Sequence, residues 1–177
     1  MPDAMKSYTA RGRTYLVTAT EGDAREWGDY VEPARIKNLG EDGVPPLCEG
    51  VLTEEQLADE ELGRLNVSTG SGLRADGSCF EKLYSFGGRS FSIWSTEGDL
   101  VFDSGDDFEQ LVAREAPEFF NSDHTESVFD DRSDDKGPEP EGVTVGEIRG
   151  RTSAFVGLNG WVASRSTTSP TRAARPS

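Results

Sequence analysis

The sequence is poor in the residue types that build metal clusters and disulfide frameworks. Its 177 residues include two cysteines and one histidine, which are too few ligands for a structural zinc site of the usual composition. Cys48 and Cys79 would be joined in an exported protein, but without a second pair they make no disulfide framework. We therefore expect no structural zinc, and we interpret both cysteines as free or partly buried thiols.

Long apolar runs are also absent. Hydrophobic residues make up 34% of the chain, and no segment approaches the roughly 20 apolar residues that cross a bilayer. Residues 1–13 lack the apolar stretch of a secretion signal. The sequence thus predicts no membrane-spanning segment and no signal peptide in this chain.

Basic residues are scarce relative to acidic ones. Eighteen Lys and Arg stand against 33 Asp and Glu, which gives a formal net charge of −15, and only four of the basic residues are lysines. This charge repels nucleic-acid backbones and anionic membrane surfaces, so we exclude both as partners. An acid excess with few lysines also suits a GC-rich genome and a salt-loving organism, where ionic strength screens self-repulsion; this is a hypothesis.

Turn-forming residues are abundant, because the chain has 20 Gly and 9 Pro. A chain of this length and composition favours one domain of short strands joined by turns. Alternating apolar, β-branched and aromatic residues predict strands at residues 14–20, 89–95 and 152–158. Each has a hairpin partner across a short turn, at residues 7–10, 100–103 and 143–148 respectively. The expected fold class is all-β, built from antiparallel sheets.

A repeated hairpin sequence points to the architecture. The string Arg-Gly-Arg-Thr begins at Arg11 and again at Arg149, and a weaker echo begins at Gly87. Recurring hairpins are typical of β-propeller blades, and spacings above the common repeat of roughly 40–50 residues imply long insertions. We therefore expect a partial, propeller-like set of sheets with acidic loop insertions.

One or two short helices should decorate this scaffold. The first begins at Thr53, whose hydroxyl can cap the run that follows. The second spans residues 106–115, with Ser104 or Asp106 as its N-cap, and ends before Pro117. Residues 121–141 hold almost no apolar residue, so they form a loop that is either mobile or fixed by something that it binds.

The last segment, residues 159–177, changes abruptly to Ser, Thr, Arg, Ala and Pro. This composition is typical of a disordered tail. A second interpretation is a lost base near the codon of Leu158. With suitable wobble bases the other frame reads Glu-Arg-Val-Gly-Gly-Val-Thr-Val-Tyr-Asp-Val-Thr-Asp-Pro, which alternates like a strand and closes on a turn. We favour the frameshift and treat residues 159–177 as a disordered or out-of-frame tail.

Five stretches of the chain carry a family resemblance. They are PDA at residues 2–4, YLVTATEGDARE at 15–26, LYSFGGRSFSIW at 83–94, LVFDSGDDFE at 100–109, and the whole of residues 130–142. Through these strings, residues 1–158 resemble the choice-of-anchor I family. Members are large bacterial and archaeal β-propeller proteins, secreted or at the cell surface, some described as alkaline-phosphatase-like and some joined to nucleotidase domains. The resemblance implies that residues 1–158 are part of a propeller whose remainder is missing, and that the intact protein is extracellular or at the cell surface.

Carboxylates gather in the loops that leave the strands. Calcium takes 6 to 8 oxygen ligands, which such loops supply, so calcium is the expected cofactor. The alternative is that these acids are a solvated surface. The predicted metal ligands are Glu21, Asp23, Asp134, Asp135, Glu139 and Glu141.

Three basic residues near these acids could bind phosphate oxygens, namely Arg25, Arg89 and Lys136. Residues 134–142 are loosely similar to acidic loops in calcium-dependent phytase-like and phosphatase-like propellers, where the metal polarises a phosphoryl oxygen and activates water. This is an analogy at the level of the fold, and no catalytic residue is assigned.

Three functions follow from these observations. The first is an extracytoplasmic, calcium-binding propeller with phosphoesterase activity on a phosphorylated small molecule. The second is a noncatalytic surface or adhesion module that binds a cell-surface ligand. The third is a truncated copy without function, since an open propeller leaves unpaired sheet edges that invite aggregation.

Overall fold

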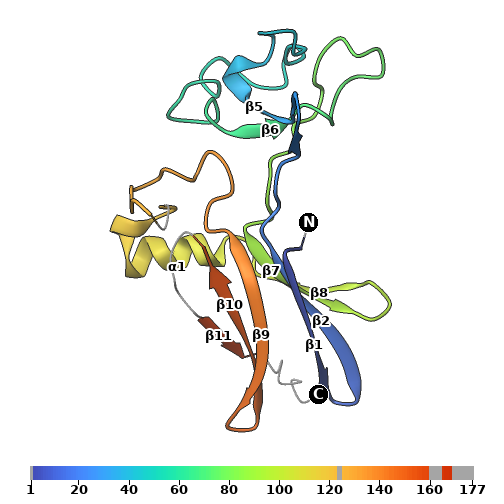
Figure 1. Ribbon diagram of the computed structural model, residues 1–177, viewed down its shortest axis with the longest axis vertical. Coiled ribbons are helices and arrows are strands. Elements are labelled where there is room, and N and C mark those ends of the chain that lie inside the picture. The colour runs from blue at the N-terminus through green and yellow to red at the C-terminus, as the bar shows by residue number, and fades with distance from the viewer. Residues whose placement is uncertain (1, 123–124, 160–164, 169–177) are drawn as a thin grey trace, which may run out of the picture.

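The computed structural model describes residues 2–122, 125–159 and 165–168, the last four by their backbone alone. As expected, the described residues form an all-β structure of several antiparallel sheets with one α-helix (Figure 1). The long strands are β1 (Ala4–Ala10), β2 (Arg13–Thr20), β7 (Ser90–Ser95), β8 (Leu100–Asp103), β9 (Pro140–Ile148) and β10 (Arg151–Leu158). The short ones are β3 (Glu26–Trp27), β4 (Tyr30–Val31), β5 (Pro33–Arg35), β6 (Asn66–Ser68) and β11 (Arg165–Thr168).

The first sheet has four strands in the order β1-β2-β7-β8. Strands β1 and β2 pair antiparallel, with Tyr8 opposite Tyr15. Arg11 and Gly12 connect them with φ angles of 52° and 74°, the left-handed pair whose twist matches that of the flanking strands. The predicted hairpin is therefore confirmed, and so is the hairpin of β7 with β8.

The second sheet has the order β11-β10-β9. Arg149 and Gly150 join β9 to β10 with φ angles of 53° and 74°, so the repeated Arg-Gly-Arg-Thr string makes the same turn twice. Strand β11 pairs with residues Ser153 to Val156 of β10. Its four residues, 165–168, belong to the segment predicted to be a tail. The rest of residues 160–177 lie outside the described residues.

The main core lies where the two sheets and the helix meet. Alternation along β2 turns Val17 and Ala19 inward, and both are fully buried. They pack with Phe91 and Ile93 of β7, with the helix residue Phe108, and with Val143, Ala154, Val156 and Leu158 of the second sheet. Fully burying a Val, Ile, Leu or Phe side chain stabilises a fold by about 1.5–3 kcal/mol, and the two alanines contribute less.

Helix α1 (Asp107–Glu115) begins one residue after the predicted start and packs Phe108 and Val112 into the core. The predicted side-chain cap is wrong. Asp106 occupies the N-cap position but makes no side-chain cap hydrogen bond. The hydroxyl of Ser104 instead accepts a hydrogen bond from the backbone N–H of Phe91, at 3.0 Å. Two single 3₁₀ turns, η1 (Ile36–Asn38) and η2 (Pro117–Phe119), complete the helical elements of the described residues.

The helix predicted from Thr53 is not formed. Its cap is present, because the N–H of Gln56 donates to the Thr53 hydroxyl at 3.3 Å and the N–H of Thr53 donates to the Gln56 side chain at 3.0 Å. The chain then continues as irregular turns, with the N–H of Leu62 bonded to the carbonyl of Gln56. Like charges four residues apart, such as Glu55 and Asp59, work against a regular helix here.

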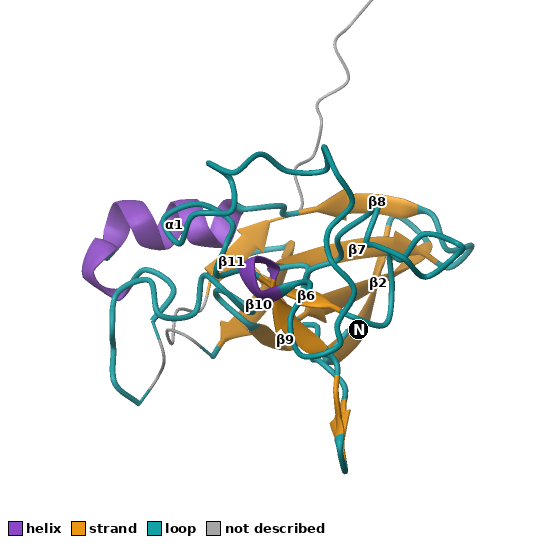
Figure 2. Ribbon diagram, turned by 90° about the horizontal axis from the view of Figure 1, so that it is seen from above, coloured by secondary structure: helices purple, strands orange, loops and turns teal. Residues whose placement is uncertain are grey.

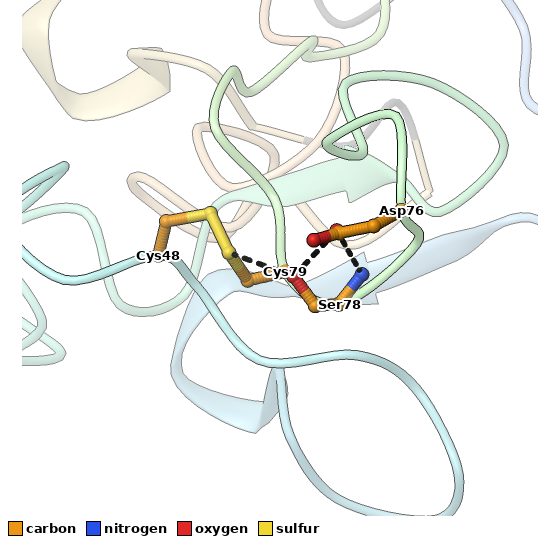
Figure 3. Close-up of a disulfide and its surroundings, with 4 residues drawn as sticks. All are labelled: Cys48, Asp76, Ser78 and Cys79. Atoms are coloured by element: carbon orange, nitrogen blue, oxygen red, sulfur yellow. Dashed lines mark hydrogen bonds between the residues drawn. A yellow bond between two sulfur atoms is a disulfide. The ribbon is translucent and has the colours of Figure 1, made fainter.

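Cys48 and Cys79 form a disulfide, so the interpretation as thiols is wrong (Figure 3). Backbone hydrogen bonds hold their two segments side by side: the N–H of Cys48 donates to Phe80 and the N–H of Phe80 donates to Pro46. A separation of 31 residues gave no sign of this pairing. The bridge closes residues 48–79 within the loop segment, residues 36–86. This segment contains η1 and β6 and lies apart from the two main sheets in Figure 1.

Candidate functional site

Three of the predicted metal ligands meet around the ammonium group of Lys136. Lys136 Nζ donates a 2.8 Å hydrogen bond to Glu21 Oε1 and lies 2.8 Å from Glu139 Oε1 and 3.3 Å from Asp23 Oδ1. Glu21 and Asp23 follow β2, whereas Lys136 and Glu139 belong to the acidic loop, residues 130–139, that leads into β9. The structure therefore brings acids from distant parts of the chain together around a lysine.

Glu139 is the most buried member of this group. It is 2% exposed, and Arg132 Nη2 contacts its Oε1 at 2.5 Å. A buried carboxylate needs such partners, because its desolvation is otherwise costly. Although burial acts to lower the pKa of Lys136, its hydrogen bonds to Glu139 and Glu21 raise that pKa overall. The lysine is thus charged at neutral pH and compensates the carboxylates.

Glu141 lies next to this group without bonding to the lysine. Its Oε1 accepts a 2.8 Å hydrogen bond from Asn159 Nδ2. Burial raises the pKa of Glu141, and the nearby charges of Glu21 and Glu139 raise it further. The carboxylates at this end of β9 therefore outnumber the cations.

Asp134 and Asp135 face other partners. Asp134 Oδ2 accepts a 2.9 Å hydrogen bond from Arg35 and lies 3.6 Å from Arg64. Burial raises the pKa of the Asp135 carboxyl. A cleft of about 330 Å³ opens here between β5, β6 and the acidic loop, and its charges balance. Its lining includes Arg35, Arg64, Arg132, Asp131, Asp134 and Asp135.

Arg89 holds the acidic loop against helix α1. Its Nη1 donates to Glu109 Oε1 at 2.8 Å, and its Nη2 donates to the carbonyls of Ser133 and Asp135 at 2.7 and 3.0 Å. A Cβ atom on Gly137 would lie 2.9 Å from Arg89 Nη1, so the glycine leaves room for the guanidinium. The loop predicted to be mobile or bound to a ligand is fixed in its described part by side chains of this chain.

Arg25 forms a bidentate ion pair with Glu32. Its Nε and Nη2 each donate a 2.8 Å hydrogen bond to the carboxylate of Glu32, which is 5% exposed. The Ser68 hydroxyl donates a further bond to Glu32 Oε1 at 2.5 Å. Arg25 and Ser68 lower the pKa of Glu32 to about 2. Both partners are therefore charged throughout the ordinary pH range.

The donor set around Lys136 does not fit calcium in this arrangement. The ion would need the space between Glu21, Asp23 and Glu139 that the ammonium takes, and 6 to 8 oxygens around it. Within the described residues, no three His, Cys, Asp or Glu side chains come together so as to hold a metal ion.

The model of the choice-of-anchor I domain matches residues 1–163 of this chain. The chain belongs to the choice-of-anchor I domain family. Two curated proteins are similar to it. Gigasin-3a from Magallana gigas is 42% identical over 105 residues, covering 56% of this chain and 37% of that protein. A mesenchyme-specific cell surface glycoprotein from Strongylocentrotus purpuratus is 29% identical over 198 aligned residues, covering 90% of this chain and 24% of that protein.

This choice-of-anchor I chain thus spans between 24% and 37% of the length of these relatives. No solved structure matches it. No helix in the described part of the chain is long and apolar enough to cross a membrane.

Sequence reasoning missed the partners of the predicted site residues in this choice-of-anchor I chain. Glu32 could have been found, since a two-residue turn at Gly28 and Asp29 places residue 25 opposite residue 32. Arg132 lies in the loop that carries the family resemblance. The sequence prediction considered only the acidic residues around it as metal ligands and did not assign a role to this arginine. Glu109 has no local signal, because its contact with Arg89 arises only when α1 packs on the sheet.

Proposed function

We propose that this choice-of-anchor I chain is a structural, non-hydrolytic part of a secreted or cell-surface protein. One observation carries the proposal: all three cations expected to bind phosphate are engaged by the chain's own carboxylates. Arg25 holds Glu32, Arg89 holds Glu109, and Lys136 holds Glu21 and Glu139, with bonds of 2.8 Å in each case. A phosphate group would have to compete with a carboxylate that is largely buried in each pair.

The surface location is supported by the disulfide and by the family. Disulfides persist in oxidising compartments and are rare in the cytosol, and Cys48 and Cys79 are joined. The relative from Strongylocentrotus purpuratus is named as a cell surface glycoprotein. Since this chain spans a minority of that protein, the location and role of the whole protein are part of the proposal.

Hydrolysis of p-nitrophenyl phosphate tests the non-hydrolytic role. We expect both the 177-residue chain and any longer protein that contains it to show no hydrolysis above background, in calcium or in EDTA. Calcium-dependent hydrolysis that is lost in Glu139→Ala and reduced in Asp23→Asn would instead support the phosphoesterase suggested by the resemblance. Asp23 is exposed, so its variant separates a loss of activity from a loss of folding.

Thiol labelling tests the location. The protein is isolated from the cells that produce it naturally and is treated with a maleimide reagent without prior reduction. The reagent should label neither cysteine until a reductant is added. Labelling of Cys48 and Cys79 in unreduced samples would show a reducing compartment and would contradict the surface assignment.

A further inference from the structure

A pair of exposed aromatic rings lies on the β3–β4 hairpin, outside the main core. The rings of Trp27 and Tyr30 face each other across the two strands, with centroids 5.0 Å apart and planes 30° apart. Trp27 is 62% exposed and Tyr30 is 37% exposed. Figure 2 shows this short hairpin projecting from the body of the molecule. The rings are therefore accessible to a ligand.

The base of the hairpin is held rigidly. The N–H of Glu32 donates to the carbonyl of Arg25, and the N–H of Arg25 donates to the Glu32 carboxylate, in addition to the two side-chain bonds of this pair. A Cβ atom on Gly70 would lie 3.2 Å from the Tyr30 hydroxyl, so the absence of a side chain at this position leaves room for the tyrosine. Rigid aromatic groups lose little conformational entropy when they bind, which favours association.

The surroundings of the rings restrict the charge of the ligand. Side chains two residues apart on a strand share a face, so Arg25 lies on the face of Trp27 and Tyr30. Its side chain is 55% exposed. Glu32 balances its charge, but the guanidinium beside the rings still disfavours a cation at that position. Glu26 and Asp29 belong to the same hairpin, and the chain carries a net charge of −15, which disfavours an anion. An uncharged ligand fits both conditions.

We propose that Trp27, Tyr30 and Arg25 form a binding platform for a neutral carbohydrate. The faces of sugar rings carry C–H groups that stack on indole and phenol rings, and their hydroxyls pair with charged and polar groups. The guanidinium offers donors at Nη1, since its Nε and Nη2 point to Glu32. Asp29 in the turn offers acceptors. This inference does not depend on the non-hydrolytic role proposed above.

Glycan binding by the full 177-residue chain tests the platform. The probes are an array of neutral oligosaccharides of glucose, galactose, mannose and N-acetylglucosamine, with sulfated and sialylated glycans and polylysine as comparisons. We expect at least one neutral glycan to bind with Kd on the order of 1 mM or tighter. Trp27→Ala should weaken this binding roughly tenfold or more, and Trp27→Phe by less, because a smaller ring still stacks.

Phe129→Ala is the matched control. Phe129 is as exposed as Trp27, at 61% against 62%, but lies in a different loop, so its loss should leave binding unchanged. Circular dichroism must show that each variant melts as the parent chain does. Binding that survives Trp27→Ala, absence of binding to any neutral glycan, or a preference for sulfated glycans or polylysine would each overturn the proposal.

Discussion

At the scale of single residues, buried charges distinguish this protein from an ordinary acidic surface. Glu32 and Glu139 are 5% and 2% exposed, and each contacts basic side chains directly. Removing one partner of such a pair leaves a desolvated charge, which costs more than the pair contributes when it is intact. These residues therefore matter to stability far more than their numerous exposed neighbours.

The Glu32 carboxylate should stabilise the fold in a pH-dependent way. Its pKa falls from 4.5 to about 2 on folding, so its contribution is complete above the unfolded pKa and disappears as the pH falls from about 4.5 towards 2. We expect Glu32→Gln to lower the free energy of unfolding by about 2 kcal/mol at pH 7 and by much less near pH 2.5.

Urea denaturation across this pH range measures the effect. Glu26→Gln, on the same hairpin but exposed, is the control and should change little at any pH. A destabilisation by Glu32→Gln that is the same at pH 7 and pH 2.5 would contradict the assignment of the charged pair.

Lys136 and Glu139 should be energetically coupled. Lys136→Met should destabilise the protein by about 3–5 kcal/mol, since Glu139 would remain buried with one partner fewer. Adding Glu139→Gln should cost less in the Lys136→Met background than in the parent chain, because the unpaired charge is then gone. A double-mutant cycle by urea denaturation gives the coupling, and strictly additive effects would show that the two side chains do not form the pair.

At the scale of elements, a close approach of two loops positions the cluster around Lys136. Gly22 follows Glu21 directly, and a Cβ atom added to it would lie 2.3 Å from the backbone nitrogen of Gly87. The two glycines thus bring the loop after β2 against the loop before β7. The acidic loop lies on the same side, since its Lys136 carbonyl is 3.8 Å from a Cβ built on Gly87.

Two glycines with the same backbone conformation should therefore respond differently to alanine. Gly12 and Gly22 have φ angles of +74° and +77°, but nothing lies within 4 Å of a Cβ on Gly12. Gly12→Ala should cost about 1–2 kcal/mol from its left-handed conformation. Gly22→Ala should cost about 1–3 kcal/mol more, because the loops must also move apart. Thermal melting compares them, and equal losses would rule out the close approach.

The disulfide should stabilise the loop segment, residues 36–86, more than the sheets. Closing a loop with a sequence separation of 31 is worth about 3–4 kcal/mol in the chain-entropy model. The paired variant Cys48→Ser with Cys79→Ser should lose about this much stability, with hydrogen exchange accelerating in this segment while β2, β7 and β10 remain protected. Unchanged exchange in the loop segment after reduction would contradict this role.

At the scale of the whole molecule, local patterns predicted the sheets and failed on contacts between distant segments. Alternation and the Arg-Gly turns located the hairpins around Gly12 and Gly150, because strand pairing across a tight turn is a local matter. The disulfide of Cys48 with Cys79 and the contact of Lys136 with Glu21, which lie 115 residues apart, depend on the packing of separate elements. No pattern in a single sequence records that packing.

The same limit explains the candidate site. The sequence identified the acids that gather near the start of β9, because their loops follow or precede predicted strands. It could not show that Lys136, predicted to bind phosphate, would sit among the predicted metal ligands Glu21, Asp23 and Glu139. Charge composition alone does not distinguish carboxylates that bind a metal ion from carboxylates that are paired with a basic side chain of the same chain.

The stability of the 177-residue chain in calcium shows whether the carboxylates around Lys136 take up a metal ion. If the carboxylates around Lys136 are compensated by the chain's own cations, the urea midpoint should be the same in millimolar calcium, in the same concentration of magnesium, and in EDTA at matched ionic strength. A midpoint that rises in calcium alone, and no longer rises in Asp23→Asn, would show that these carboxylates bind the metal and would contradict the structural role proposed for them.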